Sequence, residues 1–125
     1  MAMMFQMKVP KNTKDLSWTR HVLEKMLFYN LSQGRVRRVI KTPSRREVGV
    51  APGTTAVMQR NDKPRRKEEI WVMYKENSKF KNQNSKLGIQ NSNRVIISAW
   101  RYPGVSPKGK EIPIPEEIRE YLNIF

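Results

Sequence analysis

Apolar residues in the first third of the chain recur with the period of an α-helix. One face of residues 19–30 would carry five of them: Val22, Leu23, Met26, Leu27 and Tyr29. Ser17 or Thr19 could cap this helix at its start, and Asn30 could end it. Residues 32–41 repeat the pattern, so we expect a second helix whose buried side chains are Val36, Val39 and Ile40.

After Pro43 the period of the pattern changes from helical to two, which is typical of strands. Four strands are predicted, over residues 46–50, 55–60, 69–74 and 94–101. Residues 3–9 alternate weakly and would form either a strand or a flexible lead. The polar, Asn-rich residues 76–93 would form a long loop, which in a domain of this size is either functional or disordered.

A short helix is predicted near the C-terminus, because Pro115 is followed directly by Glu116 and Glu117. Proline suits the first turn of a helix, and acidic side chains there are favoured by the helix dipole. We expect this helix to reach about Asn123. Two helices followed by three or four antiparallel strands predict an α+β fold in which the helices pack on one face of the sheet.

The length of 125 residues favours one domain spanning 1–125. The absence of cysteine excludes disulfides, thiolate metal sites and cysteine nucleophiles, and a single histidine, His21, excludes a multi-histidine metal site. We therefore expect no metal and no cofactor. No apolar run approaches the 18 residues of a membrane span, and residues 1–9 lack the basic leader of a signal peptide. We expect a cytoplasmic protein that does not bind membranes.

The formal net charge of +14 adds an expectation about function, because it predicts a polyanionic partner. Residues 35–67 hold eleven Lys and Arg against two acidic residues, whereas residues 111–125 hold four Glu and one Arg. A concentrated basic segment is the electrostatic pattern of proteins that contact phosphates. A nucleic acid is the partner that we favour, with a solvated surface or a membrane-facing patch as the simpler interpretations.

Four segments of the chain, residues 17–26, 31–43, 70–74 and 94–100, carry a resemblance when they are taken together. They resemble a known group of small toxin-like domains, the domain-of-unknown-function 4258 group. Residues 17–26 resemble its T-x-H-A-x-x-R-M opening, although Val22 replaces the alanine and Lys25 the arginine. Leu31 to Pro43 resembles its second helix, and residues 70–74 and 94–100 resemble its last two strands. The resemblance covers about residues 16–103 and leaves 104–125 as a C-terminal extension.

This group is similar to the superfamily of metal-independent ribonucleases that includes barnase, EndoU, colicin D, colicin E5 and RelE. The resemblance implies two N-terminal helices packed on a curved antiparallel sheet of about four strands, with RNA lying on the sheet. Colicin-D-like members place a basic residue and a histidine at a helix start and Ser-x-Trp on a late strand, which Arg20-His21 and Ser98-Ala99-Trp100 match. It also implies a toxin that cleaves tRNA or mRNA and an acidic antitoxin or immunity protein as partner.

Metal-independent cleavage uses the 2′-OH of the RNA as nucleophile, so the protein must transfer protons and stabilise phosphoryl charge. The residues predicted to do this are His21, Arg20, Ser98 and Arg60. The residues predicted to bind the RNA are Trp100, Arg101, Tyr102, Arg35, Arg38, Arg65, Arg66 and Lys67. His21 would be a neutral base, because Arg20, Lys25 and the helix N-terminus all oppose its protonation. Ser98 and Trp100 would share the RNA face of a strand, with Ile97 and Ala99 toward the core.

Simpler interpretations stand beside each of these assignments. A lone histidine is more often structural than catalytic, Trp100 could close the edge of the core, and Arg60 could be a solvated charge. Trp18 and Trp71 are expected to be structural. The chain could also be a non-catalytic RNA- or DNA-binding accessory protein, or a basic inhibitor module that binds a protein. The acidic tail could cover the sheet as an autoinhibitory element or complete the core.

Overall fold

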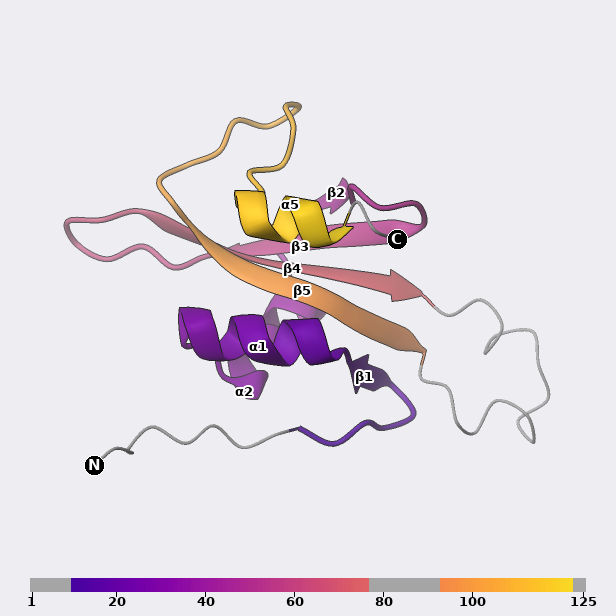
Figure 1. The fold of residues 1–125 in the computed structure, drawn as a ribbon. Helices are drawn as coiled ribbons and strands as arrows, with labels where there is room; N and C mark the ends of the chain where they lie inside the picture. The colour runs from indigo at the N-terminus through magenta and orange to yellow at the C-terminus, as the bar shows by residue number, and fades with distance from the viewer. Residues whose placement is uncertain (1–9, 77–92, 123–125) are drawn as a thin grey trace.

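The computed structural model describes residues 10–76 and 93–122, so the expectations for residues 3–9 and for the loop after residue 76 lie outside the described residues. Within this part the chain forms three helices and five strands (Figure 1). In chain order they are β1 (Leu16–Trp18), α1 (Arg20–Tyr29), α2 (Gln33–Lys41), β2 (Arg45–Val48), β3 (Thr54–Arg60), β4 (Glu68–Glu76), β5 (Arg94–Pro103) and α5 (Glu116–Leu122). The α+β class is confirmed, and the element bounds lie close to those predicted.

The sheet differs from the prediction in having five strands and mixed pairing. Its strand order is β1-β5-β4-β3-β2, and β2 to β5 pair in antiparallel fashion. The additional strand, β1, runs parallel to β5. It covers only Leu16–Trp18, which is too short for an alternating pattern to be recognised in the sequence.

Both N-terminal helices begin at the capping residues that the sequence offered. The Thr19 hydroxyl accepts a hydrogen bond from the Val22 amide at the start of α1, and Ser32 does the same for α2. Asn30 ends α1 in the left-handed conformation with a φ of 57°, which asparagine tolerates better than most residues.

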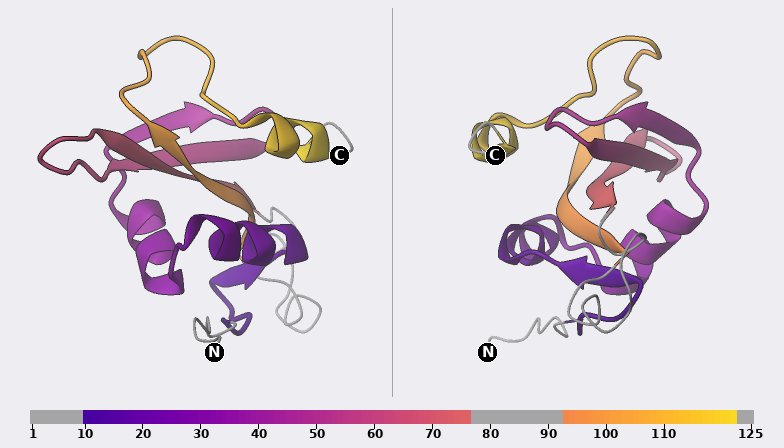
Figure 2. Two further views of the ribbon diagram at one scale, coloured as in Figure 1. Left: turned by 60° about the vertical axis from the view of Figure 1, so that its left-hand side comes forward. Right: turned by 90° about the vertical axis from the view of Figure 1, so that its right-hand side faces the viewer.

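Both faces of the sheet are covered. On one face α1 and α2 pack over side chains such as Val57, Val72 and Ile96. On the other face the C-terminal segment, with α5, packs over Trp71, Trp100 and their neighbours. Figure 1 shows α5 above and α1 below β5, and the right-hand view of Figure 2 shows both helices to the left of that strand. The acidic tail therefore completes a second core, and the expectation that one face of the sheet is open to RNA is wrong.

An irregularity in β5 decides which of its side chains lie on which face. Met73 pairs with Ser98 but the next residue of β4, Tyr74, pairs with Ile96, so that Ile97 has no counterpart in the register. Such a bulge places two successive side chains on one side of the strand. Ile97 and Trp100 consequently belong to the same core, beneath the C-terminal segment, whereas Ile96 and Ala99 belong to the other. The expected placement of Ile97 with Ala99 is wrong for this reason.

Thr19 joins the bulge to the start of α1. Its amide donates to the carbonyl of Ile96, and its hydroxyl donates to the carbonyl of Ile97 at 3.0 Å. The same hydroxyl accepts the bond from the Val22 amide. One side chain thus satisfies a carbonyl at the bulge and a free amide of the helix at once.

Replacing Thr19 by valine, which keeps its shape, should lower the free energy of unfolding by about 2 kcal/mol, because both the helix cap and the bond to Ile97 are lost. Ser32→Ala is the matched control, since Ser32 caps α2 without that second bond, and it should cost about 1 kcal/mol. Urea unfolding of the two variants measures both values. Equal costs would show that the bond to Ile97 contributes nothing.

Candidate functional site

The structure brings together two of the predicted site residues, His21 and Ser98, which are 77 positions apart. His21 is the second residue of α1, and Ser98 follows the bulge in β5. The imidazole Nε2 lies 3.0 Å from the Ser98 Oγ. His21 is half-buried, whereas Ser98 is completely buried. The imidazole can therefore reach a bound molecule, but the serine hydroxyl cannot.

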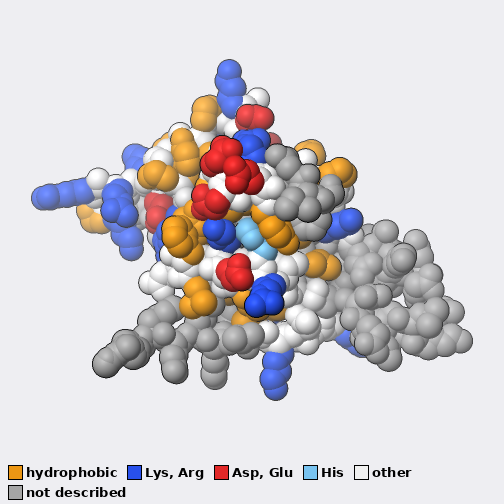
Figure 3. Space-filling model, viewed as in Figure 1, with side chains coloured by type: hydrophobic (Ala, Val, Ile, Leu, Met, Phe, Trp, Pro, Cys, Tyr) orange, Lys and Arg blue, Asp and Glu red, His pale blue; other side chains and the backbone are white. Residues whose placement is uncertain are grey.

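The third side of this site comes from α5. The ring of Tyr121 stacks on the His21 imidazole with a centroid distance of 3.7 Å and an angle of 3° between the planes. Stacking fixes the plane of the imidazole, and the bond to Ser98 fixes its rotation within that plane. His21 is the pale blue side chain that reaches the surface near the centre of Figure 3.

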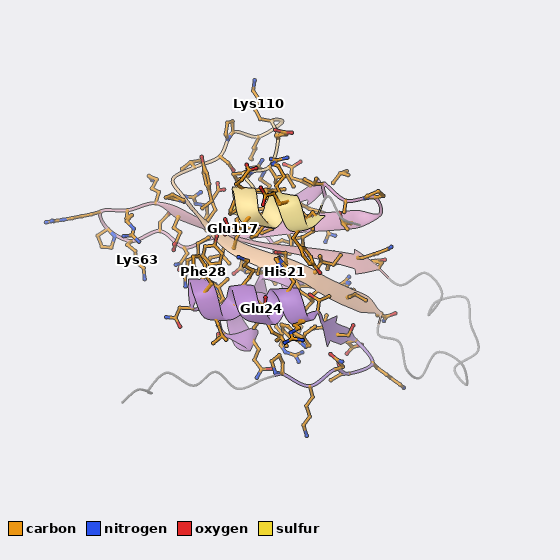
Figure 4. The ribbon with its side chains drawn as sticks, in the orientation of Figure 1. His21, Glu24, Phe28, Lys63, Lys110 and Glu117 are labelled. Carbon is orange, nitrogen blue, oxygen red and sulfur yellow. The ribbon has the colours of Figure 1, made fainter. Side chains whose placement is uncertain are left out.

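A lysine and a glutamate lie beside the histidine. Lys25 stands one helical turn after His21, and its ammonium lies 3.4 Å from a carboxylate oxygen of Glu117 at the start of α5. Tyr29, one further turn along α1, also interacts with Glu117, which raises the pKa of the phenol in addition to the larger effect of burial. Figure 4 shows Glu117 on α5 next to His21 on α1. The site is therefore the zone beside β5 in which side chains of α1 and α5 meet.

Several groups act on the pKa of His21, and the net effect is to lower it from its ordinary value. Burial is the largest cause, followed by the positive charge of Lys25. The carboxylates of Glu24 and Glu117 oppose the shift without cancelling it. The predicted direction is confirmed, although burial rather than Arg20 is the leading cause. His21 is accordingly neutral at physiological pH and can accept a proton.

Arg20 and Arg60 do not join this site. The Arg20 side chain is 93% exposed and pairs with Glu24 across one turn of α1. Arg60 lies on β3, which β4 separates from β5, and its guanidinium binds Asp62 and the fully buried Glu69. The structure therefore does not bring these two arginines together with His21 and Ser98, because Arg60 binds Asp62 and Glu69 and the Arg20 side chain extends into solvent.

The buried carboxylate of Glu69 is the centre of a hydrogen-bond network that includes Arg60 directly and Arg45 through Ser106. This carboxylate accepts from Arg60, from the Trp71 indole and from both the amide and the hydroxyl of Ser106. Arg45, also buried, donates to the Ser106 carbonyl and hydroxyl and lies 5.1 Å from the Trp71 ring. This network attaches the loop after β5 to the sheet. Each buried charge is thereby paired or hydrogen-bonded, as burial requires.

The three residues expected to bind RNA at the end of β5 have structural roles instead. Trp100 is completely buried, and its indole donates to the Pro113 carbonyl at 2.7 Å. Arg101 donates to the carbonyls of Tyr29 and Asn30 at the end of α1 and to Glu68. Tyr102 packs on the core beneath the C-terminal segment. The C-terminal segment covers Trp100 and Tyr102, whereas the end of α1 and Glu68 hold Arg101.

The remaining basic candidates lie away from His21. Arg35 on α2 is partly buried and donates to the Arg60 carbonyl, and burial together with Arg38 and Arg101 lowers its pKa. Arg38 is exposed on the same helix. Arg65, Arg66 and Lys67 are exposed at the tip of the β3–β4 hairpin, which projects at the left of Figures 3 and 4. The three hairpin residues form a basic surface that is separate from the histidine site.

Sequence reasoning missed the members of the site that come from tertiary packing, and it missed one exposed aromatic side chain. Lys25, Tyr29, Glu117 and Tyr121 were not among the predicted site residues. Phe28 is 70% exposed on α1, with the Lys25 ammonium 5.2 Å from its ring centroid. The only signal in the sequence was the four-residue spacing within each helix. Nothing in it showed that α5 would face α1.

Among residues 10–76 and 93–122, the structure contains no group of three or more His, Asp or Glu side chains that could hold a metal ion. No helix in these residues is long and apolar enough to cross a membrane. Comparisons with family models, with curated proteins and with solved structures gave no match. The site is therefore interpreted from its own geometry.

Changing the charges beside His21 should move its pKa in opposite directions. Lys25→Gln should raise the pKa because a repelling cation is lost, and Glu117→Gln should lower it because an attracting anion is lost. Arg20→Gln, an exposed position, is the control and should change it least. NMR titration of the imidazole resonances measures all three. If the pKa of His21 is the same in the Lys25→Gln and Glu117→Gln variants as in the unchanged protein, the described geometry is contradicted.

The same shift predicts how stability depends on pH. Because the pKa of His21 is lower in the folded than in the unfolded chain, protonation favours unfolding. The free energy of unfolding should therefore fall as the pH drops through about 6.5, and His21→Gln should remove this part of the dependence. Urea unfolding at a series of pH values measures this dependence. If the free energy of unfolding of His21→Gln falls with pH as it does in the unchanged protein, carboxylates rather than His21 are responsible for the fall.

Proposed function

We propose that this protein is a metal-independent endoribonuclease that cleaves RNA through the 2′-OH of its substrate. The observation that carries the proposal is the contact of His21 with Ser98 in a partly open site beside Lys25. A neutral imidazole, an ammonium and a phenol hydroxyl within two turns of one helix supply the proton acceptor and the hydrogen-bond donors that this reaction needs. The net charge of +14 supports a polyanionic substrate.

In the proposed reaction His21 removes the proton of the 2′-OH. We assign the tautomer in which the Nε2–H donates to the Ser98 Oγ, so that Nδ1 is unprotonated and serves as the base. The 2′-oxygen then forms a bond to phosphorus, and the bond from phosphorus to the 5′-oxygen breaks. The leaving oxygen takes up a proton from solvent, which gives a 2′,3′-cyclic phosphate and a 5′-OH end.

Neighbouring residues prepare and assist this step. Ser98 is a positioning residue, because it is buried and acts only through the imidazole. Lys25 stabilises the charge that develops on the phosphoryl oxygens. Phe28 offers an exposed ring on which an unstacked base could lie. The basic hairpin tip would attract the RNA strand, and an acidic antitoxin or immunity protein would cover the same charges.

A second candidate function is RNA binding without cleavage. It is favoured by the position of Arg65, Arg66 and Lys67, which are exposed on a hairpin separate from the histidine site. A surface of this kind holds phosphates whether or not chemistry follows. Cleavage assays with binding measured in parallel distinguish the two functions.

Purified protein should cleave total RNA in the presence of EDTA and leave 2′,3′-cyclic phosphate and 5′-OH ends. His21→Gln should reduce the rate by about 100-fold or more while RNA affinity stays within about twofold, because proton transfer is lost but the basic surface remains. Glu111→Gln, at an exposed position between β5 and α5, is the control. Cleavage that EDTA abolishes, or no cleavage by the unchanged protein, would overturn the enzyme proposal.

The hairpin charges should contribute to affinity irrespective of cleavage. Arg65→Gln combined with Arg66→Gln should weaken RNA binding about tenfold and lower the slope of log affinity against log salt by about 1.4. Lys108→Gln with Lys110→Gln removes the same charge from another exposed loop and is the matched control. Equal effects of the two double variants would mean that net charge, rather than the hairpin, determines binding.

A further inference from the structure

The ion pair between α1 and α5 is asymmetric in its exposure. The Lys25 side chain is 17% exposed, whereas that of Glu117 is 49% exposed. The ammonium is thus held in the floor of the site and the carboxylate lies over it from the solvent side. A mostly buried ammonium needs an anionic partner, but the geometry does not require that partner to belong to the protein.

Two donors of α1 converge on the Glu117 carboxylate. The Lys25 ammonium lies 3.4 Å from its Oε2, and the Tyr29 hydroxyl interacts with the same side chain. These donors stand four residues apart, so they lie on one face of the helix, and His21 stands four residues before Lys25 on that face. An ammonium and a hydroxyl that face one carboxylate are equally suited to the oxygens of a phosphate.

We propose that Lys25 and Tyr29 form a phosphate-binding subsite next to His21, and that the Glu117 carboxylate occupies this subsite until an RNA phosphate displaces it. The inference deepens the proposed function and rests on it for the identity of the ligand. It assigns to the acidic tail a role in substrate binding that is additional to its role in the core.

The exchange requires only a side-chain rotation. Helix α5 is anchored by Ile118 and Leu122, which are buried against the sheet, so Glu117 can turn toward solvent while the helix stays in place. The charges require the carboxylate to turn away before a phosphate can bind. With His21 neutral, Lys25 and Glu117 cancel each other, and a phosphate that approaches the occupied site is repelled by the carboxylate. Once the carboxylate has turned away, the ammonium is available to the phosphate.

Inorganic phosphate is the probe that tests this site without requiring catalysis. Titration followed by the NMR resonances of His21 and Tyr29 should show binding about fivefold tighter for Glu117→Gln than for the unchanged protein, because a competing charge is removed. Glu120→Gln removes the same charge from an exposed position of α5 and should bind like the unchanged protein. Adding Lys25→Met to Glu117→Gln should abolish the gain.

The outcomes separate this inference from the proposed function. If Glu117→Gln binds phosphate no tighter than Glu120→Gln, or if Lys25→Met leaves the gain intact, the subsite is wrong. If the gain occurs but no variant cleaves RNA, the subsite stands and the endoribonuclease proposal fails. Urea unfolding of each variant confirms that the fold is retained, and Tyr29→Phe, which keeps the ring packing, provides a second variant that should weaken phosphate binding.

Discussion

The register shift in β5 is the constraint on which the candidate site depends. Ile97 has no counterpart on β4, and its carbonyl accepts the hydroxyl of Thr19. Thr19 in turn caps α1, so the helix starts at a defined place on the edge of the sheet. Two residues later His21 lies beside Ser98, the residue that follows the bulge. A bulge therefore sets both the direction of the serine and the start of the helix that carries the histidine.

A consequence of the same geometry is that the sheet has no open face for RNA in the part of the chain described. The side chains that the bulge turns away from α1 are buried by the C-terminal segment, which supplies Ile112, Ile114 and Ile118. What remains accessible near His21 is the zone between α1 and α5. This differs from the arrangement that the resemblance to metal-independent ribonucleases implies, in which RNA lies on the sheet, and the acidic extension is the reason.

The large positive charge is divided between two roles. Arg45, Arg60 and Arg101 are held by carboxylates or backbone carbonyls and stabilise the loop after β5 and the end of α1. The hairpin arginines, Arg65 and Arg66, are instead exposed to solvent. Arginine suits both roles, because its planar group donates several hydrogen bonds at once and stays charged when partly buried. Net charge alone thus overstates the surface available to a nucleic acid.

The sequence by itself determined the local structure, since helix period, capping residues and strand alternation depend on neighbours within a few positions. Thr19, Ser32 and Pro115 marked element starts within one residue of those observed. The motifs of the sequence also identified both His21 and Ser98 as site residues, through their resemblance to known ribonucleases. Only the tertiary structure decided that Arg60 binds a buried glutamate, that Trp100 is covered, and that Lys25 and Tyr29 meet Glu117. These contacts join segments that lie between nine and about ninety residues apart, and no local pattern encodes which amphipathic face packs on which.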